Sequence, residues 1–310
     1  MSESIEGRDC NMGGLLHNGV KGWLITILAV LCLVVTCGMC GKAKESGGEP
    51  LPILRFGTTA RIWGMGNAGV AAARGVEGLY YNPAALSDLS RPELSISHSA
   101  LFSDTDLNFI AAALPITEQG GIGAGLLLLS SPGIPGTSED ALEDYFDYLQ
   151  AVAYVGTGTR INEQLGAGVT VKGLFGRLDD ATCRGYALEG GLRYKLNQVL
   201  TLGILGRDVV GRLDWTTGLT ENLPTQVLAG VEASLWDGRL QVAAQTDTTF
   251  KDRGFGAEYI IGEQIRVRGG YTKESLTAGV GLGVGSIHLD YSWVGHELGG
   301  THRISFMVGF

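Results

Sequence analysis

The side chains that could hold a metal ion or carry out acid–base chemistry are few and widely spaced in this chain. Histidine supplies the clearest candidates, at His98, His288, His296 and His302. None of these spacings brings metal ligands together on a helix or hairpin, so we expect no metal, no cofactor and no enzymatic activity. The nearest polar pair is His288 and Asp290, which share one face of an extended strand because side chains alternate along it. We interpret this pair as polar lining.

A glycine motif offers a second kind of chemistry, phosphate binding. The sequence Gly64-Met-Gly66-Asn-Ala-Gly69 fits the pattern G-x-G-x-x-G of dinucleotide-binding proteins. That fold needs a buried strand before the glycines and an acidic residue closing a second strand about 20 positions later. No such strand precedes the motif, and Asn82 with Pro83 interrupts the place of the second. We therefore interpret the three glycines as turning points of the backbone in a crowded segment.

The elements that must position these side chains show a repeat of two. Apolar residues alternate with small or polar ones in runs bounded by turn residues, as expected for strands with one apolar and one wet face. Fourteen such runs are predicted, at residues 93–99, 107–115, 121–130, 150–158, 165–177, 185–195, 199–208, 225–235, 239–248, 254–261, 265–272, 275–284, 286–294 and 301–310.

The connections between these runs alternate in length. Tight turns such as 117–120 and 285–286 contrast with longer loops at 131–149 and 209–224. An even strand count with short turns on one side is typical of outer-membrane barrels, whose closed sheet leaves no backbone group unpaired in lipid. We therefore predict an all-β fold, a 14-stranded antiparallel transmembrane β-barrel over residues 93–310, in the outer membrane of a Gram-negative type of cell.

The last strand carries the strongest single indication of a membrane barrel. Ile304, Phe306, Val308 and Phe310 fall on one face, whereas the other face carries small or polar residues such as Ser305. An apolar face that ends on an aromatic residue suits a strand in contact with lipid and its interface. We expect outer-membrane lipid and the barrel assembly machinery as partners, with Phe306, Val308 and Phe310 as the assembly signal.

Several charged side chains fall on the inward faces of the predicted strands. Because a charge away from water is costly unless it is partnered, we expect these groups to pair with each other or with a segment inside the lumen. A lining that guides solutes is the alternative. The predicted lumen-lining residues are Lys172, Glu189, Arg193, Glu258, Arg266, Arg268, His288 and Asp290.

The amino-terminal part of the chain is typical of an export signal. Residues 23–37 form an apolar run that follows a lysine and precedes small residues. The run is shorter than the roughly 20 residues of a membrane-spanning helix, which favours a removable signal peptide over residues 1–43. Translation from Met12 would shorten its long leader. A lipid on Cys37 or Cys40 is the alternative, although neither follows the usual small residues.

Composition argues against several other classes of protein. Of 310 residues, 49 are glycine and 18% are charged, and the net charge is −9. Removal of the signal takes away three basic and three acidic residues, so the mature charge is unchanged. An acidic chain gives no support for nucleic-acid binding, which needs a basic surface. Cys183 is the one cysteine beyond the signal, so we expect no internal disulfide.

A different kind of segment lies between the signal and the first strand. A short linker at 44–55 leads to residues 56–90, which are rich in glycine and alanine and lack the repeat of two. This segment contains Arg61-Ile-Trp-Gly-Met-Gly-Asn-Ala-Gly-Val-Ala and Gly78-Leu-Tyr-Tyr-Asn-Pro-Ala-Ala-Leu, and the far end contains Gly299-Gly-Thr-His-Arg-Ile-Ser-Phe. Together these motifs resemble those of the PorV/PorQ family of outer-membrane proteins, over roughly residues 55 to 310.

That resemblance implies both a fold and a choice of functions. The family is related to the FadL-type long-chain fatty-acid transporters, 14-stranded barrels with an amino-terminal hatch that plugs the lumen and contains an Asn-Pro-Ala element. Asn82, Pro83 and Ala84 match that element. The resemblance leaves the function open, because some members serve type IX secretion and others are presumed transporters of hydrophobic compounds.

The longest connection contains an amphipathic pattern. Leu142, Tyr145, Phe146 and Leu149 fall at i, i+3, i+4 and i+7, within an acidic stretch at 139–150. We predict a short outer helix here. Its apolar stripe packs on the barrel rim or, alternatively, contacts a hydrophobic ligand or a secreted partner.

Three functions are compatible with the sequence. The first is a plugged channel for hydrophobic small molecules, which an apolar outer stripe next to a filled lumen favours. The second is a scaffold or shuttle in a type IX-like secretion system, with a secreted protein as cargo. The third, a secreted or lipidated soluble β-protein, is disfavoured because such a protein has no reason to combine an even strand count, asymmetric loops and a terminal aromatic.

Overall fold

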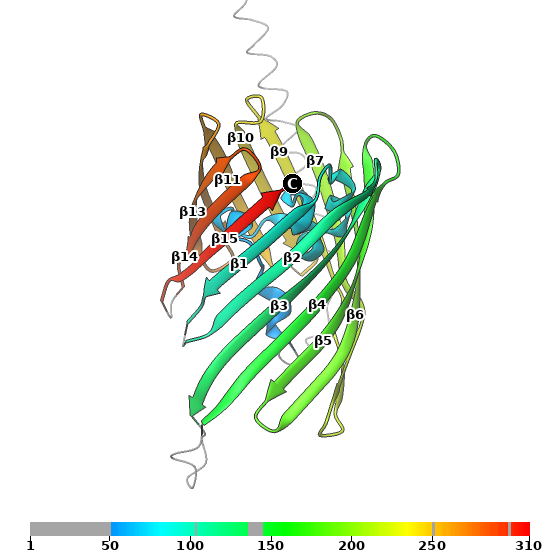
Figure 1. Ribbon diagram of the computed structural model, residues 1–310, viewed down its shortest axis with the longest axis vertical. Helices are drawn as coiled ribbons and strands as arrows, with labels where there is room; N and C mark the ends of the chain where they lie inside the picture. The colour runs from blue at the N-terminus through cyan, green and yellow to red at the C-terminus, as the bar shows by residue number, and fades with distance from the viewer. Residues whose placement is uncertain (1–50, 103, 136–144, 250–251, 297–298) are drawn as a thin grey trace, which may run out of the picture.

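The chain folds into a closed barrel with short helices inside it (Figure 1). The computed structural model describes residues 51–102, 104–135, 145–249, 252–296 and 299–310. The predicted signal peptide, most of the predicted linker and Leu142 lie outside the described residues. Among the helices that the structure does describe, none has the length and apolar character needed to cross a membrane.

Fourteen strands form the barrel wall, and one three-residue strand, β8, is an addition to it. The wall strands are β1 (Glu93–Ala100), β2 (Asp106–Thr117), β3 (Gly120–Pro135), β4 (Tyr145–Arg160), β5 (Leu165–Leu178), β6 (Ala181–Lys195), β7 (Leu200–Trp215), β9 (Gln226–Leu235), β10 (Leu240–Asp247), β11 (Arg253–Ile261), β12 (Ile265–Thr272), β13 (Leu276–Val284), β14 (Ile287–Val294) and β15 (Thr301–Gly309).

The sheet closes on itself without a free edge in the wall. Neighbouring strands pair antiparallel all the way round, and β1 pairs with β15, for example Ile96 with Phe306. β8 (Thr220–Asn222) pairs with the end of β7, and the wall continues from β7 to β9. Because the barrel is closed, every wall strand has a hydrogen-bonded neighbour on both sides, and a strand in lipid requires this. The predicted 14-stranded antiparallel barrel is confirmed.

The wall is taller on one side than on the other. β3, β4 and β7 have 16 residues each, whereas β10, β12 and β14 have 8. The green strands of Figure 1 show this difference. The predicted loops at 131–149 and 209–224 are therefore too long, because β3, β4 and β7 extend into them. Register shifts, such as the one between Ser131 and Ile134, break the repeat of two, so the sequence pattern does not show where these strands end.

The predicted outer helix is wrong where the structure describes it. Tyr145, Phe146 and Leu149 lie in β4, and Tyr145 pairs with Pro135 of β3. Pairing with the preceding strand, β3, supplies backbone hydrogen bonds along this segment, and these outweigh the local helical spacing. The side chain of Tyr145 is 67% exposed.

Side chains alternate across the wall as the sequence predicts. On β15, Ile304 and Phe306 are exposed on the outer surface, while Arg303 and Ser305 are buried on the inner one. Phe310, just after this strand, is 73% exposed. The outer surface of the wall is thus apolar, which suits contact with lipid.

The lumen is filled by residues 51–89, which we call the plug. Its six short helices are η2 (Pro52–Arg55), α2 (Ala60–Gly64), α3 (Gly69–Ala72), η3 (Gly75–Glu77), α4 (Gly78–Tyr81) and η4 (Pro83–Asp88). They lie within the ring of strands in Figure 1. The plug starts earlier than the predicted boundary at residue 56, because Leu51, Ile53 and Leu54 are also buried.

The plug shares one apolar core with the taller side of the wall. Fully buried plug residues such as Ile62 and Leu79 belong to the same cluster as Leu107, Leu127 and Tyr154 of the wall. The lumen is therefore packed with side chains on this side rather than filled with water.

Candidate functional site

The plug lies against the wall where the wall carries glycine. A Cβ atom on Gly191 would lie 2.0 Å from Oδ1 of Asn82, and one on Gly168 would lie 2.4 Å from the carbonyl carbon of Pro83. A Cβ on Gly256 would lie equally close to the backbone that follows α2. Larger side chains at these wall positions would displace the plug, so the inward glycines set how closely it fits.

The three motif glycines in the plug have different roles. Gly66 has φ of +65°, and a Cβ there would lie 2.3 Å from the carbonyl oxygen of Phe255. Gly64 ends α2, and Gly69 begins α3 against the ring of Tyr81. The predicted turning role therefore applies to Gly66, whereas the other two permit close packing. The motif joins two plug helices, which differs from the strand-to-helix turn of a dinucleotide site.

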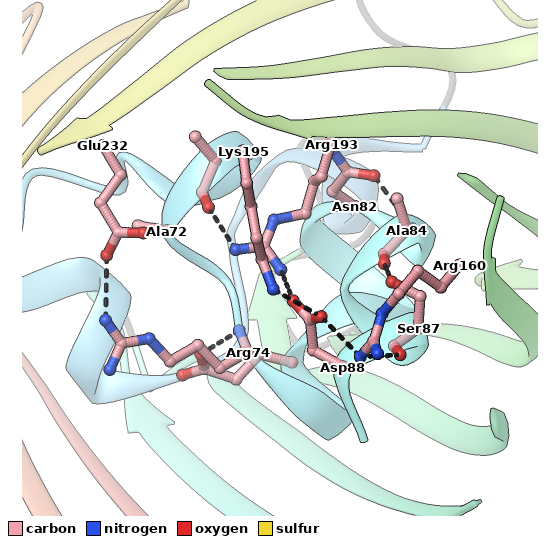
Figure 2. Close-up of polar contacts among 12 residues, drawn as sticks. Ala72, Arg74, Asn82, Ala84, Ser87, Asp88, Arg160, Arg193, Lys195 and Glu232 are labelled. Carbon is pink, nitrogen blue, oxygen red and sulfur yellow. Dashed lines mark hydrogen bonds and ion pairs between the residues drawn. The ribbon is translucent and has the colours of Figure 1, made fainter. Parts of the chain in front are cut away.

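Asn82 connects the plug to two wall strands. Its side-chain oxygen accepts a hydrogen bond from the backbone N–H of Ala84 at 3.1 Å and so caps η4 (Figure 2). Its amide nitrogen donates to the carbonyl oxygens of Val70 at 2.8 Å, Leu192 at 3.2 Å and Ile204 at 3.4 Å. This fully buried amide thus fixes the Asn-Pro-Ala turn against β6 and β7.

Asp88 attaches the end of the plug to the tight-turn end of the barrel. Its carboxylate lies 2.8 Å from Lys195, 3.1 Å from Arg193 and 3.5 Å from Arg160 (Figure 2). Arg193 also donates to the carbonyl oxygen of Ala71 at 3.0 Å. Burial by itself would raise the pKa of Asp88, but the hydrogen bond from Lys195 and the nearby positive charges outweigh it and hold the pKa below its ordinary value.

A second set of ion pairs surrounds Arg61 of the plug. Arg61 lies 2.9 Å from Glu77 within the plug and 3.9 Å from Glu258 on the wall. Glu258 also pairs with Arg268, whose other partner is Asp290 at 2.7 Å. Elsewhere, Arg74 reaches Glu232 of β9 at 3.1 Å, as Figure 2 shows. Charges of both signs therefore join the plug to several strands.

A third set lies on β5, β6 and β7. Lys172 contacts both Glu189 and Asp208, and Arg55 of the plug reaches Asp208 at 3.3 Å. Arg207 and Asp208 are adjacent in the chain, yet both are buried. A register shift of β7 against β6 places them together, and Asp208 takes a left-handed φ of +51°. The strict repeat of two failed to identify Asp208, although two successive charges within an apolar strand are a usable signal for a bulge.

The predicted lumen-lining residues divide into two groups. Arg266 follows the tight turn between β11 and β12, where it donates to the carbonyl oxygen of Gln264 at 3.3 Å, and His288 follows the tight turn between β13 and β14. The other predicted residues are buried and take part in the ion pairs described above: Lys172, Glu189, Arg193, Glu258, Arg268 and Asp290.

A cavity of about 450 Å³ opens at the long-loop end of the barrel, and we call it the vestibule. The plug supplies Phe56 and Trp63 to its lining, and the connection after β1 supplies Leu101 and Phe102. Val294 at the end of β14 adds a further apolar side chain. Aromatic and aliphatic groups at such a mouth can bind an apolar molecule. The sequence carries no local signal for this site, because its lining comes from loops and strand ends that no single pattern groups together.

The vestibule is more basic than the chain as a whole. Among the described residues, its lining has four basic and two acidic side chains, although the chain has a net charge of −9. These residues are Arg55, Arg253, Lys273, Arg303, Asp252 and Glu274.

Comparisons with known proteins place the fold but not the family. No family model matches the chain, and no curated protein matches its sequence. Among solved structures, the barrel is similar to the CymD monoaromatic hydrocarbon channel, with a TM-score of 0.63, 15% identity, and coverage of 85% of this chain and 99% of the other. It is also similar to the toluene transporter TbuX of Ralstonia pickettii, with a TM-score of 0.59, 16% identity, and coverage of 82% of this chain and 98% of the other. A FadL homologue of Pseudomonas aeruginosa is similar with a TM-score of 0.57, 11% identity, and the same two coverages.

These similarities show a common architecture. The chain has the fold of FadL-type outer-membrane barrels. The structural match extends over nearly the full length of each neighbour. At 11–16% identity, they show the fold alone. The PorV/PorQ resemblance finds no counterpart among them.

Proposed function

We propose that this chain is an outer-membrane channel that takes up apolar small molecules past a movable plug. The vestibule is the observation that carries the proposal. Phe56 and Trp63 of the plug line it together with Phe102, at the long-loop end of the barrel. An apolar molecule gains free energy by leaving water there before it meets the lumen.

Passage in this proposal requires the plug to rearrange. Met65, Leu79 and Leu86 of the plug are fully buried inside the barrel. The contacts between plug and wall are discrete groups of hydrogen bonds and ion pairs, such as those of Asn82 and Asp88. Part of the plug can therefore detach while the wall keeps its own backbone hydrogen bonds.

The similar solved structures support this proposal through their names. CymD is described as a monoaromatic hydrocarbon channel, and TodX of Pseudomonas putida is described as a toluene transporter. The same proposal includes export by the amino-terminal signal and membrane assembly through Phe306, Val308 and Phe310. The alternative is a scaffold role in type IX-like secretion with a protein cargo, which the PorV/PorQ resemblance implies. Ligand binding distinguishes the channel role from this scaffold role.

Binding of a neutral fluorescent probe, N-phenyl-1-naphthylamine, to the purified protein tests the proposal. Changing Phe56 and Phe102 to Ser removes two apolar surfaces, each worth on the order of 1.5–3 kcal/mol when fully buried. We expect the affinity of the double variant to fall at least roughly tenfold. The matched control changes Tyr145 and Phe146 to Ser, since these aromatic residues lie on β4 and do not line the vestibule; it should bind as the wild type does.

Two outcomes would contradict the proposal. Loss of binding in the Tyr145 and Phe146 variant, with normal binding in the vestibule variant, would restore the contact site predicted from sequence. Absence of binding by every form, together with co-purification of a secreted protein, would favour the scaffold role.

A further inference from the structure

Arg303 is a buried cation of the vestibule for which the described residues supply no carboxylate. It lies on β15, its exposed fraction is 2%, and it lines the cavity. Its Nη1 atom donates to the hydroxyl of Ser99 at 3.2 Å, and its guanidinium lies 4.2 Å from the centre of the Trp63 ring. Its Nε atom is buried without a hydrogen-bond partner.

The other buried cations of the barrel differ from Arg303. Lys172, Arg193, Arg207 and Arg268 each lie within 4 Å of at least one carboxylate. A buried charge is costly unless it is paired, and a buried donor without an acceptor adds to that cost. The unmatched guanidinium of Arg303 therefore indicates a partner that the described residues do not supply.

We infer that Arg303 is a specificity-determining residue that receives the carboxylate of an aromatic acid bound in the vestibule. This inference rests on the proposed function and names the class of molecule. A guanidinium binds a carboxylate through charge-assisted hydrogen bonds, and its face can remain on Trp63 because those bonds lie in the guanidinium plane. A neutral hydrocarbon of the same shape offers no acceptor to the free Nε.

The surroundings of Arg303 favour an aromatic acid of one ring. Phe56, Trp63 and Phe102 offer aromatic surfaces around the cavity, and the ring of Phe102 stacks with that of His296 at 5.2 Å. The volume of about 450 Å³ lies toward the lower part of the range for small-molecule sites, roughly 300–1,000 Å³. The excess of basic over acidic lining also attracts an anion despite the acidic chain.

Calorimetric binding of two matched probes tests this assignment. The probes are 4-isopropylbenzoate and its uncharged amide, 4-isopropylbenzamide, each titrated into the full-length purified protein. We expect the wild type to bind the acid about tenfold or more tightly than the amide, the factor that corresponds to one hydrogen bond to a charged group. Arg303→Met should make the two affinities similar, mainly by weakening the binding of the acid.

Arg212→Met is the control, since Arg212 is an exposed arginine of β7 outside the vestibule lining. It should keep the preference for the acid. Arg303→Lys should keep part of it, because lysine retains the charge without the planar donors. Each variant is compared with the wild type by its change in gel mobility on heating, which shows that the barrel has formed.

The outcomes separate this inference from the proposed function. If the wild type binds the amide as tightly as the acid, or if Arg303→Met keeps the preference, the role of Arg303 is refuted while the channel proposal stands. If neither probe nor the neutral fluorescent compound binds, the proposed function fails as well. Should Arg303→Met not assemble, the acid-to-amide ratio of the wild type and of Arg303→Lys still decides the question.

Discussion

Asp88 shows how a single side chain can hold the plug at the tight-turn end. Its carboxylate faces Arg160 of β4 together with Arg193 and Lys195 of β6, and 26% of it is exposed. Without its negative charge, the three cations would repel one another and lose their common partner. The charge of Asp88 therefore stabilises the contact between η4 and two strands.

Replacing Asp88 by Asn should loosen the plug. We expect the ion conductance of the variant in a planar bilayer to rise above that of the wild type, because the last turn of the plug loses its ionic contacts. Asp214→Asn is the control, since Asp214 pairs with Arg212 in an exposed position on β7 away from the plug. Equal conductance in Asp88→Asn and the wild type would show that other contacts hold the plug.

The same contact predicts a pH dependence. The pKa of Asp88 is lower in the folded chain, so its contribution is complete above the unfolded value of about 3.9 and is lost as the pH falls through the lower folded pKa. Wild-type conductance should therefore stay constant from about pH 8 to pH 5 and rise only below about pH 4. Asp88→Asn should lack this acid step, and an unchanged step in the variant would assign it to another carboxylate.

Gly66 tests the close fit of plug and wall at one position. Gly66 and Gly262 have nearly the same φ, +65° and +63°, but a Cβ on Gly262 would meet no atom within 4 Å. Gly262→Ala should therefore cost about 1–2 kcal/mol of stability from backbone strain alone. Gly66→Ala should cost more and raise conductance, because its Cβ would collide with Phe255. Similar stability losses, measured by thermal unfolding in detergent, would refute the close contact.

At the scale of elements, the plug and the wall depend on different interactions. The wall strands pair with each other through backbone ladders, whereas the plug is held by side chains such as Asn82, Asp88 and Arg61. The strands β3, β4 and β7 of the taller side continue where the sequence suggested loops. The wall therefore does not need the plug for its hydrogen bonding.

Removing residues 56–89 while keeping the strands tests this division. The barrel should still form and still migrate anomalously on a gel without heating, because its ladders remain intact. Conductance in a planar bilayer should rise, since fourteen strands enclose a lumen wide enough to hold a plug. Unchanged conductance would mean that these residues do not block the lumen, and failure of the barrel to form would mean that the plug is part of its folding core.

At the scale of the whole molecule, closure of the sheet is the dominant constraint. β1 and β15 are far apart in the sequence, yet they pair along their whole length. Such pairing leaves no edge that detergent or another chain can easily open. Boiled and unboiled samples should therefore migrate differently on a denaturing gel, and identical mobility combined with solubility in water would contradict a membrane barrel.

The sequence by itself determined the wall of this protein. A repeat of two in each strand assigns residues such as Phe306 to the outer surface and Ser305 to the inner one, because strand geometry links neighbouring side chains to opposite faces. The strand number, the antiparallel closure and the inward position of charges such as Lys172 followed from this local rule. The Asn-Pro-Ala element indicated the plug through the resemblance to the PorV/PorQ family.

Only the tertiary structure decided what happens inside the wall. The bulge that places Arg207 beside Asp208 depends on the register between β6 and β7. The vestibule joins Trp63 of the plug to Arg303 of the last strand, and residues 145–149 became a strand because β3 lies beside them. These features depend on contacts between separate segments of the chain. A periodic pattern indicates on which face of a strand a residue lies, but not which residue it contacts there.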